Sequence, residues 1–210
     1  MKNVTDRTSN PFGMRPPCAH DDPSLESAVF GYGDANADFH LIGDHPGVHG
    51  GETTGVPFTE TDSGEAIGAL ASDLEFASGP RDRPDFENLV ASYLHMCTLP
   101  DGRTPTDEEY ADLERYFDAE LRAINAHILM PVGARATDHV LTEYTTQRRR
   151  LELDMAALHA REIRGRGFLV VPIQDPIEWE SGDREAIRST LEDHLNSDYR
   201  QTKGVATLVG

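Results

Sequence analysis

Residues 38–64, DFHLIGDHPGVHGGETTGVPFTETDSG, contain the stretch that decides the fold. Its first five residues form a short, mainly apolar run that predicts a buried strand. The sixteen residues that follow, 43–58, contain five glycines, two histidines and two acids. Glycines directly after a strand let the backbone approach a ligand closely and direct amide groups at it. This stretch therefore predicts a ligand-binding loop at the end of a strand.

The rest of the chain alternates between strand and helix patterns. Strands are expected at 38–42, 86–96, 127–132 and 168–171, and helices at 63–76, 106–124, 133–144 and 183–195. The 86–96 segment also fits a helix. Such alternation predicts an α/β domain with a parallel sheet, where ligands bind beyond the carboxyl ends of the strands. The loops 43–58, 97–105 and 172–182 are expected to meet there.

The helix at 106–124 has the clearest local signals. Thr106 and Glu109 form a capping-box pattern, and the expected apolar face consists of Tyr110, Leu113, Phe117, Leu121 and Ile124. Ser63 is the expected N-cap of the preceding helix. Residues 1–28 are rich in Pro, Asp and Ser and are expected to be irregular, with Phe12 and Met14 as docking points on the core. The folded domain is expected to span 29–200.

Charge is the strongest global feature of the chain. The formal net charge is -18, with 19 Lys and Arg against 37 Asp and Glu, and the only lysines are Lys2 and Lys203. Acid excess with so little lysine favours a protein from a halophile, in which molar salt screens self-repulsion; the alternative is an acidic protein from a mesophile. Net acidity normally argues against nucleic-acid binding. That argument weakens in molar salt, where counterion release adds little attraction for any protein.

The cellular setting is predicted from what the sequence does not contain. There is no run of eighteen apolar residues, so we expect no transmembrane helix. The start, MKNVTDRTSNPFG, has no apolar segment of the secretory kind, and a cytoplasmic location is expected. Two cysteines, Cys18 and Cys97, are too few for a disulfide framework, and Cys97 is expected to be a small buried hydrophobic residue. We expect a monomer.

The loop itself leaves several chemistries open. The glycine-rich fingerprints of nucleotide-binding proteins are absent. His45 and His49 are four residues apart on a Gly/Pro loop, without a supporting third ligand, so no metal is expected. Asp44 and His49 either orient a water molecule or cap the amide groups of the loop. Phe58 is either a core residue or a platform for a planar ligand. The arginines at 148–150 either meet phosphates or pair with surface acids, and we favour the surface.

The segment GDHPGVHGGETTGVPFTETDSGE resembles the first motif of the uracil-DNA glycosylase superfamily, most closely its type 5 and type 4 branches. The residues that match are Gly43, Pro46, His49, Gly50, Gly51, Thr54, Gly55, Phe58, Thr59, Ser63 and Gly64. FGYGDANADFHLIG is similar to the lead-in of the family. CTLPDGRTPTDEEYADLERYFDAELRAINAHILMPVGARA is similar to its second conserved region. The resemblance covers roughly residues 10–195.

The resemblance implies a three-layer α/β/α fold around a four-stranded parallel sheet. Family members flip a damaged base out of DNA and hydrolyse its N-glycosidic bond. By position, Phe58 would stack on the base, and Asp44, His45 or His49 would orient the attacking water. The pocket would be lined by the backbone of the first motif, at Gly43, Pro46, Gly47, Gly50 and Gly51, with Tyr93 and Asp175 also at the substrate.

Two positions depart from the pattern of the family. Asp175 stands where a histidine usually donates to the base anion, and a carboxylate could donate only if a strongly raised pKa kept it protonated. Tyr93 stands where the type 4 branch has an asparagine that reads uracil. Type 4 members also hold an iron–sulfur cluster through four cysteines. This chain has two cysteines, so no cluster within one chain, and no other cofactor, is expected.

Two functions follow from this comparison of motifs. The first is a DNA glycosylase for uracil or another deaminated base. The second is a catalytically degenerate member that binds nucleic acid or a base without cleaving it. DNA is the expected partner in either case. Nothing in the residues supports a third class, a small-molecule enzyme on the same scaffold.

Overall fold

The computed structural model describes residues 15–18, 28–124 and 126–196. Of the segment expected to be irregular, 1–28, only 15–18 and 28 fall within these ranges. Phe12 and Met14 lie outside them. None of the helices in the described ranges has the length and apolar content to cross a lipid bilayer.

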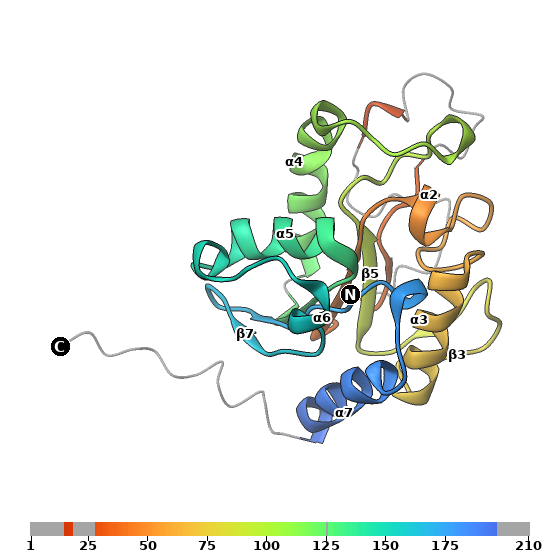
Figure 1. Ribbon diagram of the computed structural model, residues 1–210. Coiled ribbons are helices and arrows are strands. Elements are labelled where there is room, and N and C mark those ends of the chain that lie inside the picture. The colour runs from red at the N-terminus through yellow and green to blue at the C-terminus, as the bar shows by residue number, and fades with distance from the viewer. Residues whose placement is uncertain (1–14, 19–27, 125, 197–210) are drawn as a thin grey trace.

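A six-stranded sheet forms the centre of the molecule (Figure 1). Its strand order is β1 (Tyr32–Gly33), β5 (Leu89–Tyr93), β2 (Phe39–Gly43), β6 (Ile128–Pro131), β8 (Leu169–Val170) and β7 (Ile163–Arg164). The four inner strands are parallel, and both edge strands are antiparallel. The expected parallel sheet is therefore confirmed, with one antiparallel strand added at each edge.

Helices cover both faces of this sheet, which confirms the three-layer α/β/α architecture. On one face lie α3 (Asp62–Asp73) and α7 (Asp183–Asn196); on the other lie α4 (Asp107–Ile124), α5 (Gly133–Tyr144) and the short α6 (Met155–Leu158). Strand β2 shows how the sequence specifies this arrangement. Phe39 and Leu41 belong to the core under α3, whereas Ile42 belongs to the core under α4 and α5, because side chains alternate between the faces of a strand.

The local helix signals were partly right. The capping box of α4 is confirmed: the Thr106 amide donates to Glu109 (2.8 Å), and the Glu109 amide donates to Thr106 Oγ1 (3.3 Å). The predicted apolar face is buried at Leu113, Phe117, Leu121 and Ile124, while Tyr110 is only partly buried. The prediction of Ser63 as the N-cap of α3 was wrong. The helix begins at Asp62, and the side chain of Thr61 caps it by accepting a hydrogen bond from the Gly64 amide.

The predicted strand at 86–96 divides into two parts. Leu89–Tyr93 forms the fully buried strand β5, which excludes the helical alternative. Before it, β4 (Asp85–Phe86) pairs with β3 (Ala77–Ser78) in a separate two-stranded hairpin beside α3. The break falls at Asn88, which has a positive φ of 55°.

The two cysteines are joined in a disulfide, Cys18–Cys97. Cys97 is buried beside Met96 and Leu113, as expected, but it is not a free hydrophobic residue. The bond fastens residues 15–18 to the chain directly after β5. The Tyr116 hydroxyl adds a second link by donating to the Arg15 carbonyl (2.7 Å).

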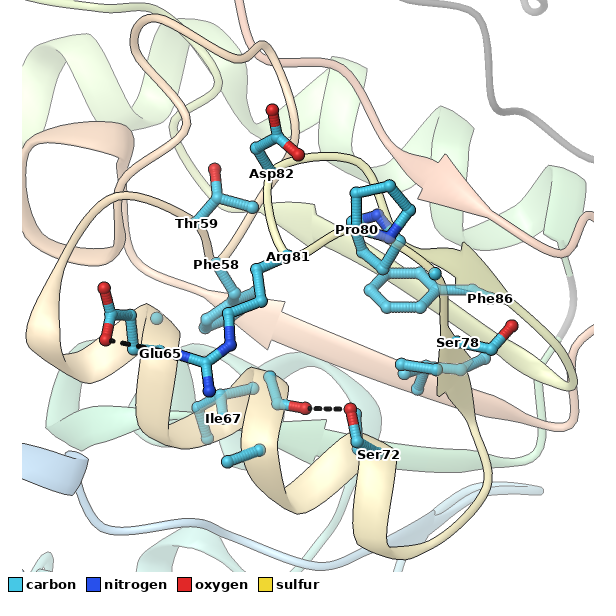
Figure 2. Close-up of a pocket in the computed structure, with 18 of the residues that line it drawn as sticks. Phe58, Thr59, Glu65, Ile67, Ser72, Ser78, Pro80, Arg81, Asp82 and Phe86 are labelled. Atoms are coloured by element: carbon cyan, nitrogen blue, oxygen red, sulfur yellow. Dashed lines mark hydrogen bonds and ion pairs between the residues drawn. The ribbon is translucent and has the colours of Figure 1, made fainter.

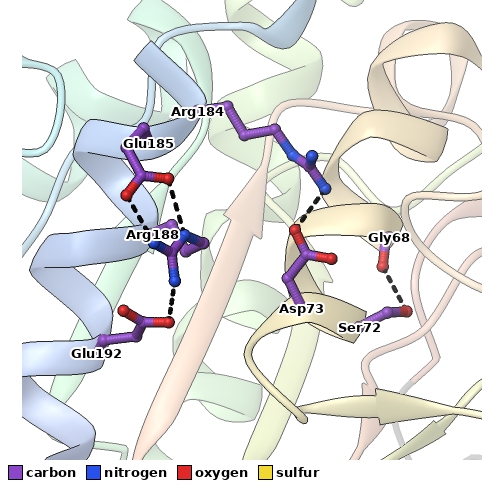
Figure 3. Close-up of polar contacts among 7 residues, drawn as sticks. All are labelled: Gly68, Ser72, Asp73, Arg184, Glu185, Arg188 and Glu192. Atoms are coloured by element: carbon purple, nitrogen blue, oxygen red, sulfur yellow. Dashed lines mark hydrogen bonds and ion pairs between the residues drawn. The ribbon is translucent and has the colours of Figure 1, made fainter. Parts of the chain in front are cut away.

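Arginines pair with acids over the surface of the molecule. Figure 3 shows Arg184 of α7 reaching Asp73 of α3 (2.7 Å), and Arg188 between Glu185 and Glu192 of its own helix. At η2 (Arg148–Arg150), Arg148 pairs with Asp138, which agrees with a surface role for that segment. Exposed pairs of this kind contribute about 0.2–1 kcal/mol each, so they orient helices more than they stabilise the fold.

Candidate active site

The loop after β2 contains one turn of helix, α2 (Pro46–His49). The sequence predicts a Gly/Pro loop without a helix at this place, and that part of the prediction is wrong. Pro46 and Gly47 form the first half of the turn, and His45 is the residue immediately before it. A proline at the first helical position explains why the turn starts here, because its missing N–H would be unpaired in any case.

Close backbone approach explains the glycines at both ends of this turn. A Cβ on Gly43 would lie 2.6 Å from the Tyr93 ring and 2.8 Å from the Phe58 ring. Gly50 has a φ of 84°, and a Cβ there would lie 1.6 Å from the Thr59 carbonyl oxygen. Gly51 meets the Val56 carbonyl in the same way. These glycines let the loop fold back on itself, so its backbone is fixed in place around α2.

Three predicted site residues are linked in a row: Asp44, His49 and Asp175. The Asp44 amide donates to His49 Nδ1 (3.0 Å), and His49 Nε2 lies 3.4 Å from Asp175 Oδ2. Because Nδ1 accepts a hydrogen bond, the proton of the neutral ring is assigned to Nε2, the nitrogen beside Asp175. His49 therefore caps the loop amide, as one of our two alternatives held, and also joins the ends of β2 and β8.

Asp175 is held in its charged form. Burial raises the pKa of this carboxyl, but hydrogen bonds from His49 and from the Ile177 amide outweigh burial, and the net pKa is lowered. The side chain also caps η3 (Pro176–Glu178). A protonated Asp175 that donates to a base anion is therefore not what this geometry supports.

Phe58 lies in a stack of three aromatic rings. Its ring is 5.2 Å from that of His49 at 29°, and 5.5 Å from that of Tyr93. Tyr93 is fully buried, and both hydrogen bonds of its hydroxyl stay within the protein: it accepts from the Phe58 amide (2.8 Å) and donates to the Gly50 carbonyl (3.0 Å). Tyr93 thus supports the loop, and its hydroxyl is not free to read a base.

Asp44 is surrounded by further polar residues. The sequence alone did not indicate that these residues belong to the site. The Tyr110 hydroxyl donates to Asp44 Oδ1, and the Arg135 guanidinium lies 4.2 Å from the centre of the Tyr110 ring. His95 contacts the edge of the same ring and is buried close to His45. Burial lowers the pKa of both His45 and His95. The sequence contained one weak indication that His95 and Arg135 belong to the site: each lies within a few residues of the carboxyl end of a strand.

The buried Nε2 of His45 has no hydrogen-bond partner among the described residues, and, unlike Nε2 of His49, it has no ion-pair contact with a carboxylate there either. A buried imidazole nitrogen without a partner costs free energy unless something binds it. In the described part of the chain no group of three or more His, Cys, Asp or Glu is placed to hold a metal ion.

A cavity of about 470 Å³ lies beside α3 and the β3–β4 hairpin (Figure 2). Phe58 is the one predicted site residue among its described lining residues. The floor is apolar, with Leu41, Ile67 and Phe86, and the exposed Arg81 and Glu65 lie 3.9 Å apart at its mouth. Among the three stacked rings only Phe58 lines the cavity, and Asp44, His49 and Asp175 are not part of it.

Comparison with known proteins identifies the family. A model of the uracil DNA glycosylase superfamily matches residues 30–192. The chain is 30% identical over 127 residues to the type-5 uracil-DNA glycosylase of Thermus thermophilus, which covers 59% of this chain and 58% of that protein. It is 31% identical over 110 residues to the type-4 uracil-DNA glycosylase of Thermotoga maritima, which covers 52% of each. The matched part thus spans between half and three fifths of these relatives. Since the family match extends over most of the sequence and includes both the first motif and the strand ends that hold the site, the chain belongs to the uracil DNA glycosylase superfamily.

Proposed function

We propose that this chain is a DNA glycosylase that hydrolyses the N-glycosidic bond of uracil, or of another deaminated base, flipped out of DNA. The observation that carries the proposal is the convergence of Asp44, His45, His49 and Asp175 at the carboxyl ends of the parallel strands. Ligands bind at this edge in open α/β sheets. Enzymes that act on a base in DNA hold the flipped nucleotide in an active-site pocket, and we place that nucleotide at this edge.

Asp44 is the residue proposed to orient the water. Its side chain is partly exposed, and Oδ1 accepts from Tyr110 while Oδ2 accepts no hydrogen bond from the described residues. A carboxylate oxygen in this position accepts a proton from water. In the reaction, the bond between C1′ and the base nitrogen breaks with its electron pair passing to the base. The water oxygen bonds to C1′, and the water proton passes to Asp44.

The departing base anion needs hydrogen-bond donors, and His45 is the best placed. Its lowered pKa keeps the ring neutral, and a neutral imidazole still carries one N–H. A donor of this kind stabilises the developing negative charge in the manner of an oxyanion hole. Asp175 acts indirectly, since its negative charge keeps the Nε2 proton of His49 in place.

The aromatic stack imposes a condition on base binding. Phe58 already stacks on His49, so a base that stacks on the same face of Phe58 has to displace the imidazole. Displacement breaks the contact with Asp175 and the hydrogen bond from the Asp44 amide. Base binding would therefore be coupled to movement of His49.

The second candidate, a member that binds without cleaving, is favoured by one specific observation. Tyr93 fills the position of the asparagine that reads uracil in the type 4 branch, and its hydroxyl is committed to Phe58 and Gly50. Such a protein would retain the fold and affinity for DNA while lacking turnover.

One experiment separates the two candidates. The purified chain is incubated in molar KCl with duplexes and single strands that carry uracil, hypoxanthine or xanthine, and abasic sites are counted. We expect product with at least one base. Asp44→Asn should lower kcat by roughly a hundredfold or more, while the control Asp118→Asn, which alters another carboxylate bonded to a tyrosine, should not. Binding to damaged DNA without any product would favour the second candidate.

A further inference from the structure

Asp44 and Tyr110 come from segments far apart in the sequence. Asp44 follows β2, and Tyr110 lies in the first turn of α4, where its hydroxyl donates to Asp44 Oδ1. Burial and the Asp44 carboxylate both raise the pKa of the Tyr110 phenol. The phenol therefore keeps its proton and remains a donor through the neutral range.

Tyr110 is itself held from two sides. Arg135, in the first turn of α5, stacks over its ring at 4.2 Å and also pairs with Asp107 (3.2 Å). The His95 ring meets its edge at 5.6 Å, and His95 Nδ1 is 3.1 Å from the Cys97 carbonyl oxygen. The phenol is thus fixed by residues that follow β5 and β6, although it lies on a third element.

A second tyrosine–carboxylate pair in the same helix layer provides a contrast. Tyr144 donates to Asp118 Oδ1, and Arg122 donates to Asp118 Oδ2 (3.0 Å), so both oxygens of that carboxylate are occupied. At Asp44 only Oδ1 is occupied by a described residue. The two pairs have the same chemistry, but only the Asp44 pair leaves an oxygen open for another ligand.

We propose that Tyr110 is a positioning residue for Asp44, and that the Arg135–Tyr110 stack aims the open oxygen Oδ2 of Asp44 at the water of the glycosylase reaction. This inference rests on the proposed function. Tyr110 does not touch the substrate in this role. It restricts the rotation of the carboxylate, which would otherwise sample orientations that cannot hold a water at the sugar.

The test compares Tyr110→Phe with Tyr144→Phe, two variants that each remove one phenol–carboxylate hydrogen bond. Tyr110→Phe should lower kcat roughly tenfold to a hundredfold with little change in KM. Tyr144→Phe should keep both the wild-type kcat and the wild-type KM. Equal effects of the two variants would overturn the positioning role.

A second measurement does not depend on activity. The ionisation of Tyr110, followed by NMR of ring-labelled tyrosine, should occur at lower pH in Asp44→Asn than in the wild type, because the negative neighbour is gone. An unchanged titration would overturn the inference even in an active enzyme. If the wild type forms no abasic product but the titration moves as expected, the proposed function and the catalytic role of Tyr110 fall together, and the hydrogen bond stands as a structural contact.

Discussion

His49 and Asp175 face each other across the carboxyl edge of the sheet, with His49 Nε2 3.4 Å from Asp175 Oδ2. The contact joins the first motif to the segment after β8, more than a hundred residues later in the chain. The resemblance to the family implies a histidine at position 175, where this chain has an aspartate. In the folded chain Asp175 instead faces His49, a histidine of the first motif.

The lowered pKa of Asp175 predicts a pH-dependent contribution to stability. The charged carboxylate should stabilise the fold above the ordinary value of 3.8, and this stabilisation should disappear as the pH falls through the lower value of the folded state. Asp175→Asn should therefore lower the free energy of unfolding by about 1–2 kcal/mol at pH 7 and by less at pH 3. Urea unfolding from pH 3 to 7 measures the difference. The control Asp112→Asn, at an exposed site on α4, should parallel the wild type. A constant effect of Asp175→Asn at every pH would contradict the prediction.

Two glycines should respond to alanine in opposite directions. Gly43→Ala would place a Cβ 2.6 Å from the Tyr93 ring, so we expect a loss of roughly 1–3 kcal/mol and weaker function. Gly68→Ala, within α3, meets no atom within 4 Å and should add about 0.5–1 kcal/mol, because alanine favours the helix. Thermal unfolding of both variants is the measurement. A similar loss of stability in both variants would mean that the tight packing at Gly43 does not cause the destabilisation of Gly43→Ala.

The charge of -18 predicts a salt-dependent fold. Screening of like charges should raise Tm steadily between low salt and molar KCl. Unfolding curves in KCl, with an uncharged osmolyte at matched osmolality as the control, separate screening from general exclusion of solutes. A Tm that stays level in KCl would remove the argument for a halophilic protein, which remains a prediction.

The Cys18–Cys97 bond should stabilise the fold by constraining the unfolded chain. The bonded residues are 79 apart in sequence, and a loop of that length corresponds to as much as about 4 kcal/mol. Reducing agent should therefore lower the stability of the wild type. The double variant Cys18→Ser, Cys97→Ser should already be less stable and should not respond to reductant; a response there would show that the reagent acts elsewhere.

The sequence supported the layers of the fold better than the details of the site. Alternating strand and helix patterns, and the Thr106–Glu109 box, depend on local periodicity and capping, which are readable from neighbouring residues. The edge strand β1 and the disulfide depend on contacts between distant segments. Tyr110 illustrates the limit: its spacing places it on the apolar face of α4, yet its hydroxyl bonds to Asp44. No pattern within the helix specifies that contact.

The Tyr93 hydroxyl accepts from the Phe58 amide and donates to the Gly50 carbonyl, and this has a consequence for exchanging parts between relatives. An asparagine at this position is too short to reach both the Phe58 amide and the Gly50 carbonyl. The 43–58 loop and Tyr93 should therefore be transferred together when segments are exchanged between relatives. A chimaera that receives the loop without the tyrosine should misplace Phe58. One that receives both should present the loop as it stands here.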